Sequence, residues 1–209
     1  MGASKETEQR LLDCALTLFS QKGYAATSIR EIIEAAGVTR PVLYYYFTNK
    51  EALFARLIEV THTGAYQKLG ATLTQDSSCE TRLRLLIRGS FAFCVRDPRL
   101  PRLLFQVTYG PPLEEVSKVV DALVALRFGL VVSIVQEGIS SGELQGGTAE
   151  SLALAFCCLM DQHINSLCSL PHPESRLTPE LADGLLALFL HGAGIGERQR
   201  IALPAIPLR

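Results

Sequence analysis

Between Arg40 and Lys50 the chain carries a run of side chains suited to contact a nucleic acid. An arginine guanidinium can donate two parallel N–H bonds to O6 and N7 of guanine. Three consecutive tyrosines, Tyr44, Tyr45 and Tyr46, offer hydroxyls that can bond phosphates, and their rings are costly to leave in water. Lys50 would lie in the first turn of a following helix, where its ammonium and free backbone N–H groups could hold a phosphate.

Two short helices and a tight turn are predicted to position these side chains. Ser28 and Glu31 have the spacing of a capping box, which predicts a helix that ends near Gly37. Thr39 can cap the next helix, with Pro41 tolerated in its first turn. This pattern fits a helix-turn-helix. Its predicted inner face consists of Ile32, Ile33, Ala36, Val38, Leu43 and Phe47.

Helical periodicity continues along almost the whole chain, and no sustained period-two alternation indicates strands. A first helix is expected at about 5–22, and Thr48 with Glu51 forms a second capping box that opens a helix through about residue 73. Later helices are expected at about 79–96, 99–108, 113–140, 148–169 and 178–195. The fold class is therefore all-α. We expect a three-helix DNA-binding domain at residues 1–50, a helical bundle at 51–196 and a loose tail at 197–209.

Composition excludes several classes of protein. The 209 residues carry 20 lysines and arginines against 21 acids, so the overall charge gives no support for nucleic-acid binding, which must come from local placement. The longest apolar run, Leu152–Met160, is too short to span a bilayer, and no signal peptide is visible, so a cytoplasmic protein without membrane contact is expected. No nucleophile–base pair, metal cluster or phosphate loop is visible, so neither an enzyme nor a cofactor is predicted.

The pattern from Leu11 through Leu53 resembles the tetracycline-repressor (TetR) family of bacterial regulators. It shares Phe19-x-x-x-Gly23-Tyr24, Ala26-Thr27-Ser28, Ala36-Gly37-Val38-Thr39, the Leu43–Phe47 aromatic run and Lys50-Glu51-x-Leu53. About 45 residues carry this resemblance, and Ile33 departs from it where a small residue is usual. The resemblance implies an all-α dimer that binds DNA. The implied DNA-contacting residues are Thr27, Ser28, Arg30, Thr39, Arg40, Pro41, Tyr44, Tyr45, Tyr46 and Lys50.

The last two predicted helices are apolar on nearly every side, and such helices must be buried on every side. In a C-terminal pair this favours a partner chain, and the resemblance implies a four-helix dimer interface. The alternative is a core within one chain. The interface is predicted from Leu152, Phe156, Leu159, Leu181, Leu185, Leu188 and Phe189.

A ligand pocket is predicted among the helices from about 51 to 140, with His163 as an added polar group, because aromatic residues gather there. The ligand is expected to be a largely apolar small molecule. The predicted lining is His62, Phe91, Phe93, Phe105, Gln106, Tyr109, Phe128 and His163.

Together these patterns predict a ligand-responsive DNA-binding regulator, most simply a repressor that binds a pseudo-palindromic operator as a homodimer. One alternative is a thiol sensor using Cys94, Cys157, Cys158 or Cys168, although these cysteines lack basic neighbours at helical spacing. The segment from Arg82 to Arg102 contains six arginines. Two interpretations of them are open: ion pairs with acidic neighbours, or a surface that faces an anion.

Overall fold

The computed structural model describes residues 2–63, 67, 69–71, 73 and 77–193. Within these ranges all regular elements are helices, which confirms the all-α prediction. The predicted tail at 197–209 and the end of the last predicted helix lie outside the described residues. Two compact units divide the chain: residues 1–65 with 99–123, and residues 66–98 with 124–209.

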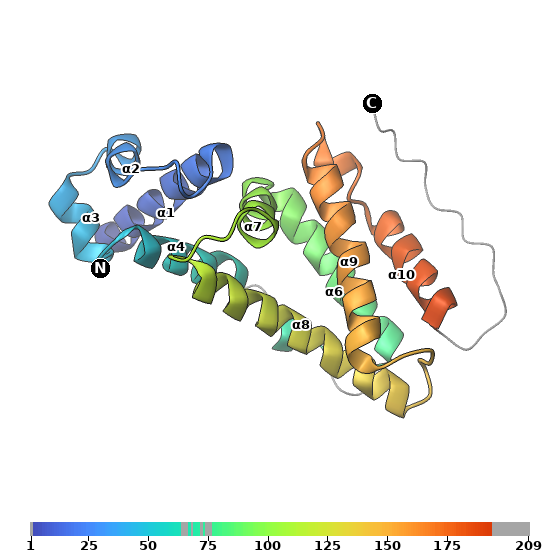
Figure 1. Cartoon of the computed structure of the whole chain (residues 1–209). Helices are drawn as coiled ribbons and strands as arrows, with labels where there is room; N and C mark the ends of the chain where they lie inside the picture. Colours follow the sequence, from blue (N-terminus) through green and yellow to red (C-terminus); the bar gives the residue numbers. More distant parts are fainter. Residues whose placement is uncertain (1, 64–66, 68, 72, 74–76, 194–209) are drawn as a thin grey trace. The chain divides into compact units, whose positions relative to one another are not determined.

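The first unit contains the predicted helix-turn-helix. Its elements are α1 (Gly2–Lys22), α2 (Ile29–Ala36), α3 (Arg40–Tyr46), α4 (Lys50–Ile58), the π-helical segment η1 (Glu59–Thr63) and α7 (Arg99–Tyr109). In this unit α1 packs against α2, α4 and α7, and α2 packs against α3 (Figure 1). Helix α1 is therefore the common packing partner in this unit, directly for α2 and through α2 for α3.

Local sequence explains where these helices begin and end. Ser28 caps α2 through a complete capping box with Glu31, as predicted, and Gly37 ends the helix in the left-handed conformation at φ 62°. Thr39 occupies the N-cap position of α3 but its side chain makes no capping bond. The capping box predicted for Thr48 and Glu51 is wrong. Asn49 caps α4 instead, accepting a bond from the Ala52 N–H at 2.7 Å. After Ile58 the chain continues directly into η1, and residues 67 and 69–71 are again helical, so helical structure reaches nearly as far as predicted.

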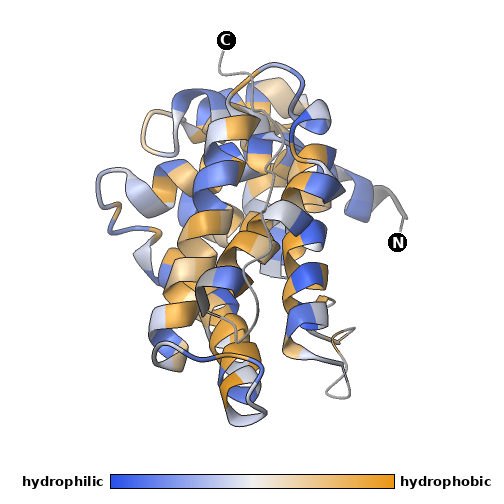
Figure 2. Cartoon of the chain, turned by 90° about the vertical axis from the view of Figure 1, so that its right-hand side faces the viewer, coloured by the Kyte–Doolittle hydropathy of each residue, from blue (hydrophilic) through white to orange (hydrophobic). Residues whose placement is uncertain are grey.

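The second unit is a helical bundle. It contains α6 (Cys79–Arg96), α9 (Ala149–Cys168), the 3₁₀ turn η2 (Pro173–Ser175), α10 (Pro179–Ala193) and most of α8 (Ser117–Ser140). Helices α6, α9 and α10 lie side by side (Figure 1) and enclose one hydrophobic core. Hydrophobic and hydrophilic residues alternate along the helices (Figure 2), as expected for helices that are each covered on one side.

Helix α8 is long and apolar. In the described ranges it is the one helix that could cross a membrane by length and composition alone, and 28% of its most apolar stretch is buried. Gly138 of α8 lets α6 approach closely, because a Cβ there would lie 2.6 Å from the Cys79 sulfur.

Candidate nucleic-acid interface

The second short helix, α3, presents one solvent-facing side. Arg40, Pro41, Tyr44 and Tyr45 are exposed, and Tyr45 is the most open at 78%. Among the described residues the Arg40 guanidinium makes no ion pair, so all of its N–H donors face water. The major groove of DNA is wide enough for an α-helix, and exposed aromatic and cationic side chains on such a helix can contact its bases and phosphates.

The opposite side of α3 is fixed in the core of the first unit. Leu43 is fully buried and Phe47 is 3% exposed, and Ile32 and Ala36 of α2, the helix that packs against α3, are buried as well. This confirms four of the six residues predicted for the inner face. Ile33 and Val38 are half-buried. Because α3 is held from one side only, its outer residues can enter a groove without loss of its own packing.

Three of the predicted DNA-contacting residues donate hydrogen bonds to backbone carbonyls of the first unit. Thr27 is 1% exposed, and its hydroxyl donates to the carbonyl of Gly23 at 2.9 Å. The Tyr46 hydroxyl donates to the carbonyl of Ser4 at 2.9 Å. Lys50 is half-buried, and its ammonium donates to two backbone carbonyls. The sequence pattern could not reveal these contacts, because each joins residues that lie far apart in the chain or depends on the loop conformation.

The remaining residues of the predicted set lie at the surface of α2 and at the start of α3. Ser28 and Thr39 are exposed N-cap residues. The side chain of Arg30 is 80% exposed and pairs with Glu34 at 2.7 Å, one turn further along α2. Such an exposed pair is weak and screened by salt, so Arg30 can exchange Glu34 for a phosphate at small cost.

An exposed ion pair adds to the packing of α2 against α1. Lys22, in the last turn of α1, forms an ion pair with Glu31. Hydrogen bonds from Lys22 and then from the backbone and hydroxyl of Ser28 lower the pKa of Glu31 to about 2. Glu31 therefore stays ionised at neutral pH, where it completes the capping box and ties the start of α2 to α1.

The predicted interface residues of the last two helices divide into two groups. Phe156, Leu181, Leu185 and Phe189 are buried in the core of a single chain, where the rings of Phe156 and Phe189 lie 5.4 Å apart. Leu152 and Leu159 are half-buried against the same core. Leu188 is 43% exposed, and Leu154, which was not predicted, is 56% exposed. Leu154 and Leu188 therefore offer the most apolar area of these leucines to another molecule.

The predicted ligand-pocket residues are divided between the two units. In the second unit Phe91 is buried, Phe93 and Phe128 pack against the core, and His163 Nδ1 bonds the carbonyl of Leu159 at 2.7 Å. In the first unit His62 is buried, Phe105 is half-buried and Gln106 is exposed. The rings of Phe105 and the exposed Tyr109 lie 4.7 Å apart.

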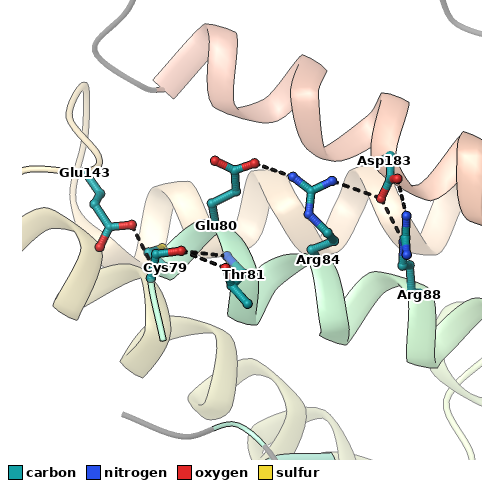
Figure 3. Close-up of polar contacts among 8 residues, drawn as sticks. Cys79, Glu80, Thr81, Arg84, Arg88, Glu143 and Asp183 are labelled. Carbon is teal, nitrogen blue, oxygen red and sulfur yellow. Dashed lines mark hydrogen bonds and ion pairs between the residues drawn. The ribbon is translucent and has the colours of Figure 1, made fainter. Parts of the chain in front are cut away.

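Four members of the arginine-rich stretch form ion pairs with acidic residues. Arg84 contacts Glu80 and Asp183, and Arg88 binds the same Asp183 with two N–H groups (Figure 3). Arg82 pairs with Glu137 at 2.7 Å, and Arg99 pairs with Asp13 at 2.7 Å. The stretch therefore joins α6 to α8 and α10 in one unit and α7 to α1 in the other.

The thiols give no support to redox sensing. All six cysteines are free, and only Cys158 is exposed. Burial raises the pKa of Cys79 and of Cys157 to about 11. The pKa of Cys94 is raised by a hydrogen bond with Cys168 and by burial. Because the thiolate is the reactive form, these cysteines are poor nucleophiles. The described residues also contain no group of three or more metal-ligating side chains.

A helix-turn-helix with one buried and one exposed face defines a DNA-binding domain of the helix-turn-helix class. Residues 11–57 match the model of the bacterial regulatory proteins of the tetR family. This match confirms, over the helix-turn-helix region, the resemblance seen in the sequence.

Similar proteins agree with this assignment. The chain is 47% identical over 60 residues to the transcriptional regulator AcrR of Shigella flexneri and 34% identical over 118 residues to the transcriptional regulator YdgC of Bacillus subtilis. These matches cover 29% and 54% of this chain, and the chain spans 28% and 59% of the lengths of those relatives. Its fold resembles FadR of Bacillus subtilis, solved with stearoyl-CoA, with a TM-score of 0.76 and 20% identity over 88% of this chain and 98% of FadR.

Proposed function

We propose that this chain is a cytoplasmic, ligand-responsive transcriptional regulator that represses by binding a pseudo-palindromic operator as a homodimer. The observation that carries the proposal is the exposed side of α3, with an unpaired guanidinium at Arg40 beside Tyr44 and Tyr45. Two such helices in a dimer would lie about 34–36 Å apart, which is the distance between successive major grooves on one face of DNA.

Contacts to DNA are assigned by how exposed each side chain is. Arg40 reads base edges, and Tyr44 and Tyr45 contact phosphates or thymine methyl groups. Ser28, Arg30 and Thr39 lie at exposed positions beside them and contact the backbone, with Pro41 in van der Waals contact. The internally bonded Thr27 and Tyr46 support this surface from beneath rather than touching the operator.

Selection of operators from random duplex DNA tests the proposal. The selected sequences should share a pseudo-palindrome whose half-sites are centred about 10 base pairs apart or a multiple of that distance. A ligand screen for release from the selected operator follows. Acyl-CoA compounds belong in it, because FadR shows that this fold can hold one. Selected sequences without any common motif would overturn the proposal.

The ligand site is proposed in the bundle of the second unit. Phe93 and Phe128 lie at the margin of its core, half-buried and therefore able to move without emptying it. His163 offers a polar ring nitrogen opposite the one that bonds Leu159. Ligand binding would favour a bundle shape in which the two DNA-binding domains are wrongly spaced, and the operator would be released by a population shift.

The homodimer is proposed to form through the exposed faces of α9 and α10. Leu154→Glu combined with Leu188→Glu is expected to give a folded monomer, because both side chains are exposed in one chain and neither fills its core. Sedimentation velocity measures the mass, and circular dichroism confirms the fold. Leu85→Glu on α6 is the matched control, since Leu85 is as exposed as Leu188 at 43%. A dimer that survives the double change places the interface elsewhere.

A further inference from the structure

Lys50 is the first residue of α4, and its side chain reaches back to the loop between α1 and α2. Its Nζ donates to the carbonyl of Tyr24 and to the carbonyl of Thr27, both at 3.0 Å. The same nitrogen lies 4.3 Å from the centre of the Tyr24 ring. The ammonium therefore has two oxygens and the face of one aromatic ring as its surroundings.

Both carbonyls belong to the loop between α1 and α2. Within this loop the Thr27 hydroxyl donates to the carbonyl of Gly23, and the Thr27 N–H donates to the carbonyl of Tyr24 at 3.3 Å. The loop thus engages both donors of Thr27 internally, and the carbonyls of Tyr24 and Thr27 accept from Lys50. Thr27 directly precedes Ser28, the N-cap of α2, so Lys50 fixes the place at which α2 begins.

The ring of Tyr24, which faces the ammonium, is fixed by packing. Tyr24 is 4% exposed, and its ring packs against Phe19 and Phe54 with centroid distances of 5.3 Å. Burial raises the pKa of Tyr24 to about 12, so its ring stays neutral and keeps a negative face toward the ammonium. Burial also lowers the pKa of Lys50.

An ammonium group has three N–H donors. Two of them serve the loop, and the aromatic ring lies within cation–π distance of the same nitrogen. At most one N–H of Lys50 is therefore left for a DNA phosphate, beside the aromatic ring. Arg40 is different, because its guanidinium makes no ion pair with the described residues and faces water.

We propose that Lys50 is a positioning residue that fastens the loop between α1 and α2 to α4, rather than a side chain that holds a DNA phosphate. The role in DNA binding rests on the proposed function, whereas the internal contacts belong to the free protein. Lys50 sets the position of α2, and α2 in turn supports α3 through their shared core.

The test compares Lys50→Met with the matched control Lys118→Met, which removes an exposed lysine of the same unit. In the DNA-free protein Lys50→Met should lower the Tm by about 4–8 °C, because two charge-assisted hydrogen bonds are lost, and the control should not. On the selected operator and on scrambled DNA, Lys50→Met should weaken binding by similar factors. The slope of log K against log salt should stay unchanged.

A phosphate contact gives the opposite result. It would leave the Tm of the free protein unchanged and lower the salt slope by about two units in a dimer. A loss of that size in the slope overturns the proposal whatever happens to the Tm. Lys50→Arg keeps the charge but replaces the compact ammonium by a planar guanidinium. It should lower the Tm as Lys50→Met does, and a Tm equal to that of the unchanged protein would also count against the proposal.

A direct observation of the ammonium separates this inference from the proposed function. In the free protein the Lys50 ammonium protons should exchange slowly enough for detection by nitrogen-15 NMR, and those of Lys118 should not. If the protein bound no operator at all, slow exchange and a lowered Tm would still support the fastening role. Fast exchange at Lys50 would refute it even if operator binding were confirmed.

Discussion

Replacing Arg40 with alanine is expected to weaken binding to the selected operator by about 1–3 kcal/mol per half-site, because a bidentate bond to one base is lost. The same change should relax the preference at one base pair in each half-site. The guanidinium is free in the described structure, so its removal breaks no ion pair and should leave the Tm unchanged.

Binding isotherms on the operator and on scrambled DNA at several salt concentrations provide the measurement. Arg102→Ala is the matched control, because Arg102 is an exposed arginine of the same unit on α7 rather than α3. Equal losses on the two DNAs would make Arg40 a phosphate contact, and base reading would pass to Arg30 or to the tyrosines. If Arg40→Ala lost no affinity for either DNA, α3 would not be part of the DNA interface.

Phe54→Ala is expected to destabilise the DNA-binding unit by about 3–5 kcal/mol, because a large fully buried ring is removed and its neighbours can close the space only in part. Phe54 is 0% exposed and packs against Phe19 and Tyr24. Since domains are stable by only about 5–15 kcal/mol, a loss of this size leaves a substantial unfolded fraction.

Urea denaturation followed by circular dichroism measures this loss. Tyr45→Ala is the control, because its ring is 78% exposed and its removal should change stability by no more than about 0.5 kcal/mol. The two variants should therefore lose operator binding for different reasons, one through unfolding and the other through lost contacts. A Phe54→Ala protein as stable as Tyr45→Ala would contradict the packing of this unit.

Sequence reasoning succeeded where the determining interactions are local. Ser28 and Glu31 lie three residues apart, so their capping box could be read from the chain and is confirmed. The boundaries of α6, at Cys79 and Arg96, match the expected range because Ser78 and Asp97 with Pro98 mark both ends. The cap of α4 was displaced by one residue, since Thr48 and Asn49 are both good N-cap residues and periodicity does not choose between them.

Long-range contacts could not be predicted in the same way. The apolar character of α9 and α10 shows that they must be covered but does not say by which chain, and α6 of the same chain covers Phe156 and Leu185. The place of Lys50 at a helix start suggested a phosphate contact, whereas its partners at residues 24 and 27 come together only when α1 and α4 pack. The fold was accessible from local patterns, whereas the roles of single polar groups depended on tertiary structure.

The distribution of the thiols makes this protein convenient to follow by fluorescence. Five of the six cysteines are buried or half-buried, and Cys158 alone is exposed, one turn beyond Leu154 on α9. Because Cys158 shares the α9 face proposed for the dimer interface, a maleimide dye should attach to it quickly in the dissociated subunit and slowly in the dimer. The labelling rate as a function of protein concentration would then report the equilibrium between subunit and dimer without mutagenesis.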